Sequence, residues 1–370
     1  MKFLFLVIGL SLSFTANADD LGVSPSEDVL REVFEYNQQL SLEDPSFLNS
    51  SSPTLSFNRA LEITAFSEWE ETGYLVFSDE NRYESERIKR QLAEGLPENV
   101  KLVVYTQNTR SSYHQDLFEY YSRMLSPERV IILKLPRGGR TSLWTRDNTP
   151  IAVKDQDNNP YLVDAKYYYN FEPDASFGQM YGIDLLSNPY FFEGGNLINN
   201  SVGDCIVVNR RRRYPFGTSD TAAIPDEVFE RSYGCTNLIR LEHIKGIGHA
   251  DEVVKFLDNN TIVTDTEAYV ERLEAQGFDV HLLPEPRTPY GTYVNSLIVN
   301  DIIYMPIFEE SGDQESFDTY QRLLPNHTIV PIESSRLSSN GQGGVHCITM
   351  TYPPYELKDL AQTLGGVLVR

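Results

Sequence analysis

The sequence is poor in cysteine and in basic residues and, after its first residues, contains no long apolar run. Three cysteines in 370 residues cannot form a disulfide scaffold, and their odd number leaves at least one thiol unpaired. Lys and Arg together number 31 against 53 Asp and Glu, which gives a formal net charge of -22. Because binding to phosphate backbones needs a basic face, we do not expect nucleic acid as a partner. Past residue 18 no window offers the ~18 uncharged apolar residues that a membrane span needs.

The remaining composition is typical of a globular protein. Hydrophobic residues make up 41% of the chain and charged residues 23%, which allows a full hydrophobic core and excludes collagen-like and disordered classes. No Pro/Ser-rich or low-complexity linker separates Ile63 from Pro354. We therefore expect one large domain over residues 58–370.

The first residues resemble a targeting signal. Lys2 precedes the apolar run Phe3 to Phe14, and the small-residue site Ala16-Asn17-Ala18 follows. This arrangement predicts a secretory signal peptide over residues 1–18 and an exported protein, periplasmic or secreted. Residues 19–57 are polar and contain one helix-like segment near Glu27 to Leu40, so we expect a loosely attached N-terminal extension there.

From Ile63 onward, short β-branched or aromatic runs alternate with helical stretches. Examples of expected strands are Gly73 to Ser78, Lys101 to Thr106, Val130 to Lys134, Val253 to Leu257 and Ser296 to Val299, with expected helices such as Glu84 to Leu96 and Ser112 to Met124 between them. The alternation favours an α/β fold built of several similar small units.

Two acidic residues stand in structured surroundings. Asp147, in the segment WTRDNTP, precedes a strand-like run and could point into a pocket, although an Asp at a turn more often accepts hydrogen bonds from its own backbone. Glu193 lies in FFEGGN, where paired glycines bring the backbone close to another group. A strand bulge or a turn is the ordinary alternative for this second motif.

Two further segments contain reactive side chains. In GIGHADE, an extended backbone would place His249 and Asp251 on the same side, because side chains on a strand repeat with a period of two. A His beside an Asp suits acid/base chemistry or charge recognition, with a surface His as the alternative. In GQGGVHC, Cys347 follows a glycine-rich approach and could serve as a nucleophile, whereas an isolated cysteine is more often buried and structural.

The other polar and cysteine-containing segments have simpler interpretations. A bridge between Cys205 and Cys235 is possible, but their spacing does not establish it. Arg210 to Arg213 is the one basic cluster, and we expect a solvated loop there, with an anion contact at the rim of a site as the second choice. Asp155 to Asn159 predicts a hairpin turn rather than a calcium loop. No metal-ligand spacing accompanies the candidate residues, so we expect no metal.

The segments WTRDNTP, FFEGGN, GIGHADE, YVNS and GGVHC, in that order, resemble the guanidino-group deiminases. The likeness is to the branch that contains the agmatine deiminases and the Porphyromonas-type peptidylarginine deiminases, and it extends from about Ile63 to Pro354. It implies a five-bladed, pseudo-symmetric α/β propeller of repeated ββαβ units. It also implies that no metal or organic cofactor takes part.

The same resemblance assigns roles to individual residues. A thiolate attacks the guanidinium carbon, ammonia leaves, and a water molecule then releases a ureido product from the thiouronium intermediate. The implied roles are Cys347 as nucleophile, His249 as general acid/base, Asp147 and Asp251 as the carboxylates that hold the guanidinium, and Glu193 as the residue that orients His249. Asn295 matches a site asparagine of the family, and Trp144 would pack on the aliphatic stem of the substrate.

One loop departs from the family pattern. Tyr169 to Pro173 lacks the arginine pair that would capture the carboxylate of a terminal arginine, and Phe171 and Glu172 would better tolerate a neutral or cationic tail. We therefore expect an exported, cysteine-dependent deiminase that converts arginine in peptides to citrulline.

Three other functions stay open. The first is an agmatine deiminase, which makes N-carbamoylputrescine for putrescine biosynthesis. The second is a non-enzymatic periplasmic protein that binds arginine or polyamines. The third is a papain-like enzyme with Cys205, His249 and Asn295, whose chain order fits but whose local signature is missing.

Overall fold

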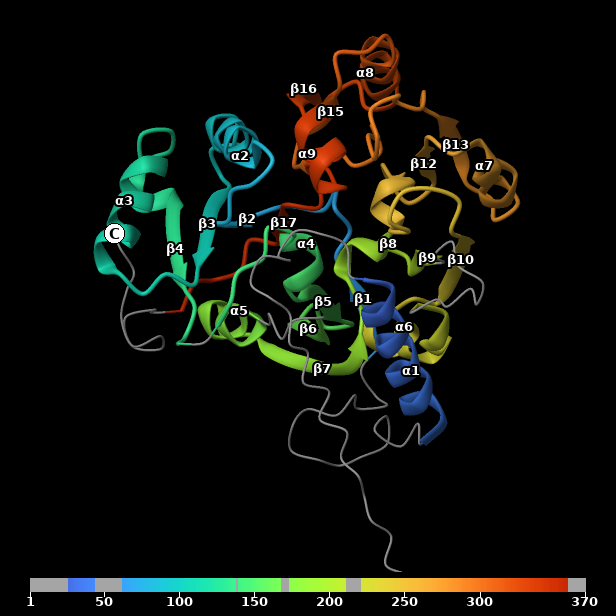
Figure 1. The fold of residues 1–370 in the computed structure, drawn as a ribbon, viewed down its shortest axis with the longest axis horizontal. Helices are drawn as coiled ribbons and strands as arrows, with labels where there is room; N and C mark the ends of the chain where they lie inside the picture. Colours follow the sequence, from blue (N-terminus) through green and yellow to red (C-terminus); the bar gives the residue numbers. More distant parts are fainter. Residues whose placement is uncertain (1–25, 44–61, 138, 168–172, 211–220, 359–370) are drawn as a thin grey trace, which may run out of the picture.

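The computed structural model describes residues 26–43, 62–137, 139–167, 173–210 and 221–358, and in these ranges the chain forms an α/β fold of five sheets. In Figure 1 the sheets follow one another around the molecule, with helices α2, α3, α7 and α8 on the outside. The expected signal peptide lies outside the described residues. None of the described helices has the length and apolar character needed to cross a bilayer.

Each sheet combines strands from one stretch of the chain with a short antiparallel strand. The first sheet has the order β1 (Ile63–Ala65), β5 (Ile151–Asp155), β6 (Pro160–Lys166), β7 (Asp184–Phe191). The next three sheets consist of β8 (Ile198–Asn199), β9 (Asp204–Asn209) and β10 (Asn237–Glu242); of β11 (Val254–Phe256), β12 (Thr261–Thr264) and β13 (Asp279–Leu282); and of β14 (Leu297–Val299), β15 (Ile302–Ile307) and β16 (Thr328–Glu333). The fifth sheet has the order β17 (Met350–Tyr352), β2 (Tyr74–Ser78), β3 (Lys101–Thr106), β4 (Val130–Lys134).

One pattern of pairing recurs in all five sheets. A short strand pairs antiparallel with a second strand, and a helix then leads to a third strand that is parallel to the second. A crossover helix is the usual way to join parallel neighbours. The helices in these positions are α5 (Asp174–Tyr181), α6 (Asp226–Tyr233), α7 (Glu267–Glu274), α8 (Gly312–Leu323) and α2 (Ser85–Glu94), while α3 (Ser111–Tyr121) leads on to β4. The predicted alternation and α/β class are confirmed.

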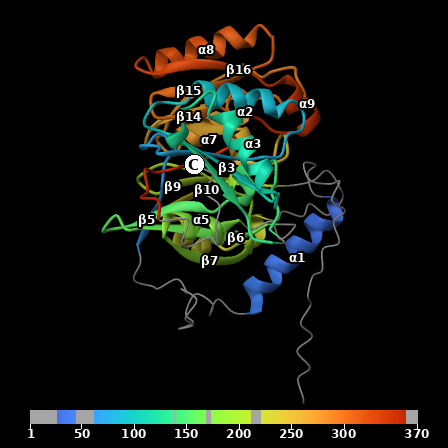
Figure 2. The same cartoon turned by 90° about the vertical axis from the view of Figure 1, so that its left-hand side faces the viewer.

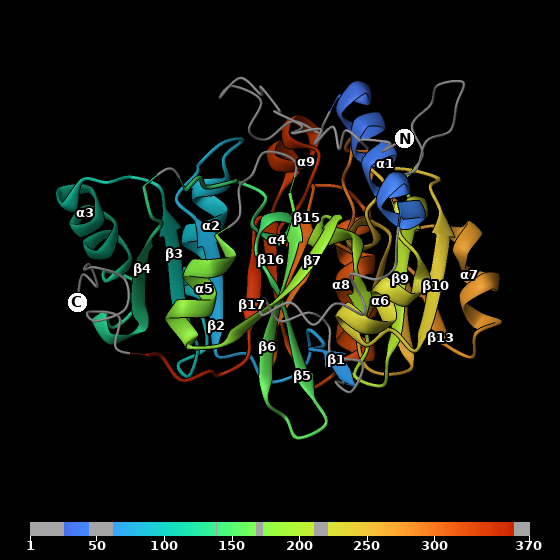
Figure 3. The ribbon, with the colours of Figure 1, turned by 90° about the horizontal axis from the view of Figure 1, so that it is seen from below.

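The fifth sheet joins segments that are distant in the sequence. β17 pairs antiparallel with β2, and Met350 lies opposite Val76. Figure 3 shows β17 beside β2. The sheet can therefore be completed only when segments near residues 76 and 350 meet.

The strands of this sheet are buried on both faces. All five residues of β2 are buried, and Val103 and Val104 of β3 are fully covered. Strands covered on both faces are expected to be continuous apolar runs, which explains why β2 and β3 could be identified from the sequence. Helix α2 contributes Ile88 and Leu92 to the same core.

Helix α1 (Glu27–Glu43) packs against the body of the protein, so the expectation of a loosely attached segment is wrong for this part of the extension. Val33 is fully buried in a cluster with Phe191. The side chain of Asn37 donates to the Phe191 carbonyl at 3.1 Å and accepts from the Phe191 N–H at 3.1 Å. Figure 2 shows α1 on the side of the molecule where β6 and β7 lie.

A disulfide bond joins Cys205 of β9 to Cys235, which follows α6. Their Cα atoms are 5.4 Å apart, a separation that disulfide geometry permits. Cys347 is the free cysteine and is buried. The bridge that the spacing left open is therefore present.

Candidate active site

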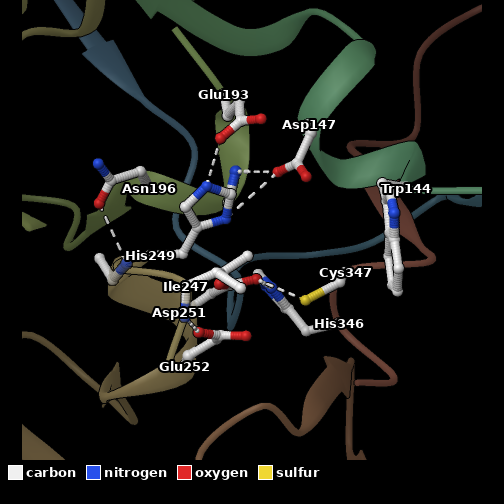
Figure 4. A network of polar contacts seen from close by, with 12 residues as sticks. Trp144, Asp147, Glu193, Asn196, Ile247, His249, Asp251, Glu252, His346 and Cys347 are labelled. Carbon is white, nitrogen blue, oxygen red and sulfur yellow. Dashed lines mark hydrogen bonds and ion pairs between the residues drawn. The ribbon is translucent and has the colours of Figure 1, made fainter. Parts of the chain in front are cut away.

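The candidate site residues stand just before the short antiparallel strand of their sheet. Asp147, in helix α4 (Thr145–Asn148), precedes β5; Glu193 precedes β8; His249 and Asp251 precede β11; Asn295 precedes β14; and Cys347 precedes β17. These equivalent segments of the five sheets meet in one place. Figure 4 shows Asp147, Glu193, His249, Asp251 and Cys347 gathered there.

Gly195 allows three of these side chains to converge. A Cβ atom at this position would lie 2.7 Å from Asp147 Oδ1, 3.0 Å from His249 Nδ1 and 3.2 Å from Asp251 Oδ2. The backbone N–H of Gly195 donates to Asp147 Oδ1 at 3.0 Å. The close backbone approach that the Gly-Gly pair predicted is therefore made toward three of the candidate side chains.

The thiol of Cys347 is buried among polar groups. Asn295 Nδ2 donates to Sγ at 3.2 Å, and the thiol donates to Asp251 Oδ2 at 3.5 Å. Asn295 Nδ2 also donates to the backbone carbonyl of Asp251 at 3.0 Å, so one amide fixes both partners. Burial, followed by the charges of Asp251, Glu252 and Asp147, raises the pKa of the Cys347 thiol well above its usual range. A cation bound among these carboxylates would oppose that effect.

His249 is held by carboxylates on both sides of its ring. Nε2 donates to Glu193 Oε2 at 2.6 Å, and Nδ1 lies 3.7 Å from Asp147 Oδ1. Burial and the charge of Arg210 lower the pKa of His249, but Asp147 and Glu193 outweigh them and raise it to about 9. His249 is therefore an imidazolium at neutral pH. No hydrogen bond reaches Nδ1, which leaves this nitrogen able to transfer a proton.

The two aspartates differ in ionisation. Burial raises the pKa of Asp147 to about 7. Burial also raises that of Asp251, but the hydrogen bond and charge of His346, with the charges of His249 and Arg146, outweigh burial and lower its pKa. Oδ2 of Asp251 is bonded, whereas Oδ1 is buried and receives no hydrogen bond. This oxygen can accept from a guanidinium N–H group.

The expectation of a solvated loop is wrong for Arg210. Its side chain is buried, Nη2 forms an ion pair with Glu193 Oε2, and the same nitrogen contacts His249 Nε2. The carboxylate of Glu193 attracts the guanidinium into the site, so the charge of this neighbour determines where Arg210 lies. Residues 211–213 lie outside the described part of the chain.

A pocket of about 370 Å³, counted to its mouth, opens onto these groups. Its walls include Trp144, Tyr167, Ile247 and Gln342. A Cβ atom at Gly343 would lie 2.5 Å from Trp144 Cζ3, so the glycine-rich segment before Cys347 makes room for the indole ring. The Trp144 ring stands beside Cys347 (Figure 4), where it can contact the stem of a substrate.

The family model for Porphyromonas-type peptidyl-arginine deiminase matches residues 68–353. The chain belongs to this family. It is a guanidino-group deiminase, a hydrolase that acts on C–N bonds.

Individual deiminases are similar to this chain over different lengths. The agmatine deiminase of Pseudomonas aeruginosa (strain LESB58) is 36% identical over 89 residues, which is 23% of this chain and 24% of that protein. A variant of the C. jejuni agmatine deiminase, solved with substrate bound, superimposes with a TM-score of 0.65 and 20% identity over 81% of this chain and 99% of that one. The agmatine deiminase of Enterococcus faecalis superimposes with a TM-score of 0.64 and 16% identity, over 80% of this chain and 96% of that one. The two structures support the same α/β fold.

The deiminase site brings together most residues that the sequence singled out. Seven of them meet in the pocket or in contact with it: Cys347, His249, Asp251, Asp147, Glu193, Asn295 and Trp144. Phe171 and Glu172 lie outside the described residues. The papain-like alternative is wrong, because Cys205 is in a disulfide and cannot act as a nucleophile.

Sequence reasoning missed two polar residues around the deiminase site, His346 and Glu68, and it gave Arg210 a contact with an anion only as the second choice. His346 stands beside Cys347 in the sequence, and this adjacency was the one available signal for it. Asp147, Glu193 and His249 place ligand atoms within 4.8 Å of one another, close enough to share a metal ion. Since Arg210 contacts two of the three, a cationic side chain already takes part in this cluster.

Proposed function

We propose that this enzyme is an agmatine deiminase, which hydrolyses agmatine to N-carbamoylputrescine and ammonia. The observation that carries the proposal is the cluster of the Cys347 thiol, the imidazolium of His249 and the partly unbonded carboxylate of Asp251 around one pocket. A planar cation with N–H groups on every side fits between Asp147 and Asp251 and presents its carbon to the thiol.

The substrate itself completes the activation of Cys347. Its guanidinium charge opposes the carboxylates that raise the pKa of the thiol, so binding favours loss of the thiol proton to solvent, which balances the proton that ammonia takes up after it leaves. Asn295, which donates to Sγ, stabilises the thiolate that forms.

The chemistry then proceeds in two halves. The thiolate attacks the guanidinium carbon, and His249 gives its proton to the departing nitrogen, so the C–N bond breaks and ammonia leaves. His249, now neutral, takes a proton from water, whose oxygen attacks the thiouronium carbon. The C–S bond breaks, the ureido product leaves, and the thiol and the imidazolium are restored with no net change in the enzyme.

The charge of the pocket favours a substrate without a carboxylate. Among the described residues that line it, the cationic side chains are Arg210 and His249, and both are paired with the carboxylate of Glu193. Agmatine carries an ammonium group where arginine carries a carboxylate and an amine, and a pocket with Asp147 and Glu193 attracts such a tail. The relative from Pseudomonas aeruginosa and both superimposed enzymes are named agmatine deiminases.

Arginine in an exported peptide is the second candidate substrate. The apolar segment before Ala18 predicts export, and the disulfide between Cys205 and Cys235 suits an oxidising compartment. A secreted enzyme meets peptides more readily than cytoplasmic metabolites. The N-terminal residue of the protein recovered outside the cytoplasm tests this proposal, and Asp19 is the residue expected there.

We propose further that the five sheets are the blades of a propeller. The repeated order of antiparallel strand, strand, helix and parallel strand supports this arrangement. A ring of five such units would place the five equivalent segments that hold the site residues around one axis.

Competition among guanidines tests the substrate. Purified enzyme is incubated with agmatine, free arginine, a peptide with internal arginine and a peptide ending in arginine, and ureido products are followed by mass spectrometry. We expect agmatine to be converted fastest and the Cys347→Ala variant to lose at least about 1000-fold in kcat, because the covalent route is gone. Faster conversion of internal arginine would favour the second candidate. Reversible binding without product, with Cys347 reduced, would contradict both.

A further inference from the structure

A second hollow lies on the other side of the catalytic segments. We call it the back hollow: about 740 Å³ of space up to its opening, lined by residues 66–72 and 350–353 and by Arg146, Gly194, Lys255 and His346 among others. It shares no lining residue with the catalytic pocket. The two linings are nevertheless adjacent in the sequence. Arg146, Gly194 and His346 line the back hollow, and their sequence neighbours Asp147, Glu193 and Cys347 line the catalytic pocket. The wall between the hollows is therefore thin.

A series of contacts between charged groups connects the catalytic pocket to the back hollow. His346 Nδ1 lies 2.8 Å from Asp251 Oδ2, and Nε2 lies 3.1 Å from Glu68 Oε2. Lys255 Nζ donates to the same Glu68 oxygen at 2.6 Å. His346 and Lys255 are almost completely buried, with 2% and 1% of their surfaces exposed. These contacts therefore connect Asp251, which contacts Cys347, to Glu68 and Lys255, which line the back hollow.

The two carboxylates in contact with the His346 ring favour its protonated form. Both ring nitrogens face carboxylate oxygens, and a carboxylate only accepts, so both contacts are hydrogen bonds only if both nitrogens carry a proton. Burial raises the pKa of Glu68, but Lys255 and His346 outweigh it and hold the pKa far below its usual range. An imidazolium at His346 therefore satisfies both carboxylate contacts at once.

We propose that His346 is a positioning residue of the deiminase and that it acts from the back hollow. Anchored on Glu68, the imidazolium holds Oδ2 of Asp251 and turns the unbonded Oδ1 toward the substrate guanidinium. The backbone N–H of His346 also donates to Asn295 Oδ1 at 3.0 Å, so the same residue aligns the amide that donates to Cys347. This role deepens the proposed function and rests on it.

Substitution of His346 is expected to weaken recognition of the cation. In His346→Gln a neutral amide replaces the imidazolium, so Asp251 loses its charged partner. Loss of a residue that orients a binding group typically costs about 10–100-fold in affinity or activity. We expect kcat/KM for agmatine to fall by about that factor, mainly through a higher KM. Glu68→Gln removes the anchor of the imidazolium and is expected to act in the same direction.

Imidazole rescue separates positioning from folding. In His346→Ala the missing ring leaves a space beside the back hollow, through which free imidazole can enter while substrate fills the other pocket. We expect imidazole to restore several-fold activity without competing with agmatine. The matched control is His114→Ala, which removes a fully buried histidine of α3 that contacts the Asn108 carbonyl, and its activity should not respond to imidazole.

The deciding measurement compares two alkylating agents of the same shape on Cys347. Chloroacetamidine carries an amidinium, whereas chloroacetamide is neutral. The wild-type enzyme should react faster with the amidinium, and His346→Gln and Glu68→Gln should lose most of that preference while their rate with chloroacetamide stays within about threefold. An unchanged preference, or equal loss of both rates, would overturn the positioning role. A wild-type enzyme without any preference for the amidinium would instead contradict the proposed function.

Discussion

Arg210 places a guanidinium of the protein itself beside the residues that act on guanidinium groups. Its charge lowers the pKa of His249, which still reaches about 9. Because His249 must carry a proton when ammonia leaves, kcat/KM should fall above pH 9. Arg210→Ala removes the positive charge that lowers the pKa of His249. We therefore expect the fall in kcat/KM at high pH, the alkaline limb of the profile, to move to higher pH by up to about one unit. Profiles of kcat/KM between pH 7 and 11 measure the shift.

A variant that keeps the charge provides the control for Arg210. Arg210→Lys retains a cation near Glu193 and should keep the limb close to its wild-type position. If Arg210→Ala has the wild-type profile, the charge of Arg210 does not act on His249.

Glu252 makes stability depend on pH. Its side chain is buried, Oε2 accepts from the Ile247 N–H at 3.0 Å, Oε1 receives no hydrogen bond, and burial raises its pKa to about 8. The folded state therefore holds a proton that the unfolded state loses near pH 4.5, so this group lowers the free energy of unfolding as pH rises from 4.5 through 8. Glu252→Gln keeps the acceptor without the charge. We expect it to unfold like wild type at pH 4.5 and to be more stable by about 2 kcal/mol at pH 8 in urea titrations.

The residues of the site differ in how far the sequence could predict them. Asp147, His249 and Cys347 lie in short motifs whose order along the chain carries the resemblance. The burial of Arg210 was not predicted, because it depends on Glu193, which stands 17 residues away and is brought near only by the fold. His346 depends on Glu68, which is 278 residues away.

At the scale of elements, α1 connects the N-terminal extension to the catalytic centre. Asn37 forms two hydrogen bonds with the backbone of Phe191, the last residue of β7, and Glu193 follows two residues later. Removal of this side chain deletes two buried hydrogen bonds, so Asn37→Ala should lower stability by about 2 kcal/mol and displace Glu193 enough to reduce kcat. Thermal unfolding and turnover of agmatine provide the two measurements.

A neighbouring position on the same helix serves as the control. Glu35 is exposed on α1, and Glu35→Ala should match wild type in both measurements. Full turnover by a destabilised Asn37→Ala protein would show that α1 supports the fold but not the position of Glu193.

The elements themselves were predictable where apolar runs are continuous. β3 and β4 have the bounds expected from the sequence, because their residues are apolar and enclosed between layers. The segment around His249 differs: it was expected to be extended, but residues Ala250–Glu252 form a 3₁₀ turn. Gly246 and Gly248 adopt positive φ angles of 65° and 86°, which bend the chain before the turn. His249 and Asp251 still converge, but the turn brings them together rather than the alternation of side chains along a strand.

For the whole molecule, the net charge of -22 predicts dependence on salt. An acidic surface attracts the doubly charged agmatine over distances that salt screens, so kcat/KM should fall several-fold as NaCl rises from about 10 to 300 mM. Alkylation of Cys347 by neutral chloroacetamide is the control and should change little. Equal sensitivity of both rates would indicate an effect of salt on the fold rather than on encounter.

The pairing of β17 with β2 also determines when the enzyme becomes active during its own synthesis. Translation delivers β2 early, and the strand that completes its sheet follows only after Cys347. A chain still on the ribosome thus contains Asp147, His249 and Asp251 before it contains Cys347. Pairing between such distant segments is also slow to form. We therefore expect reactivity toward guanidines only once this last sheet is complete.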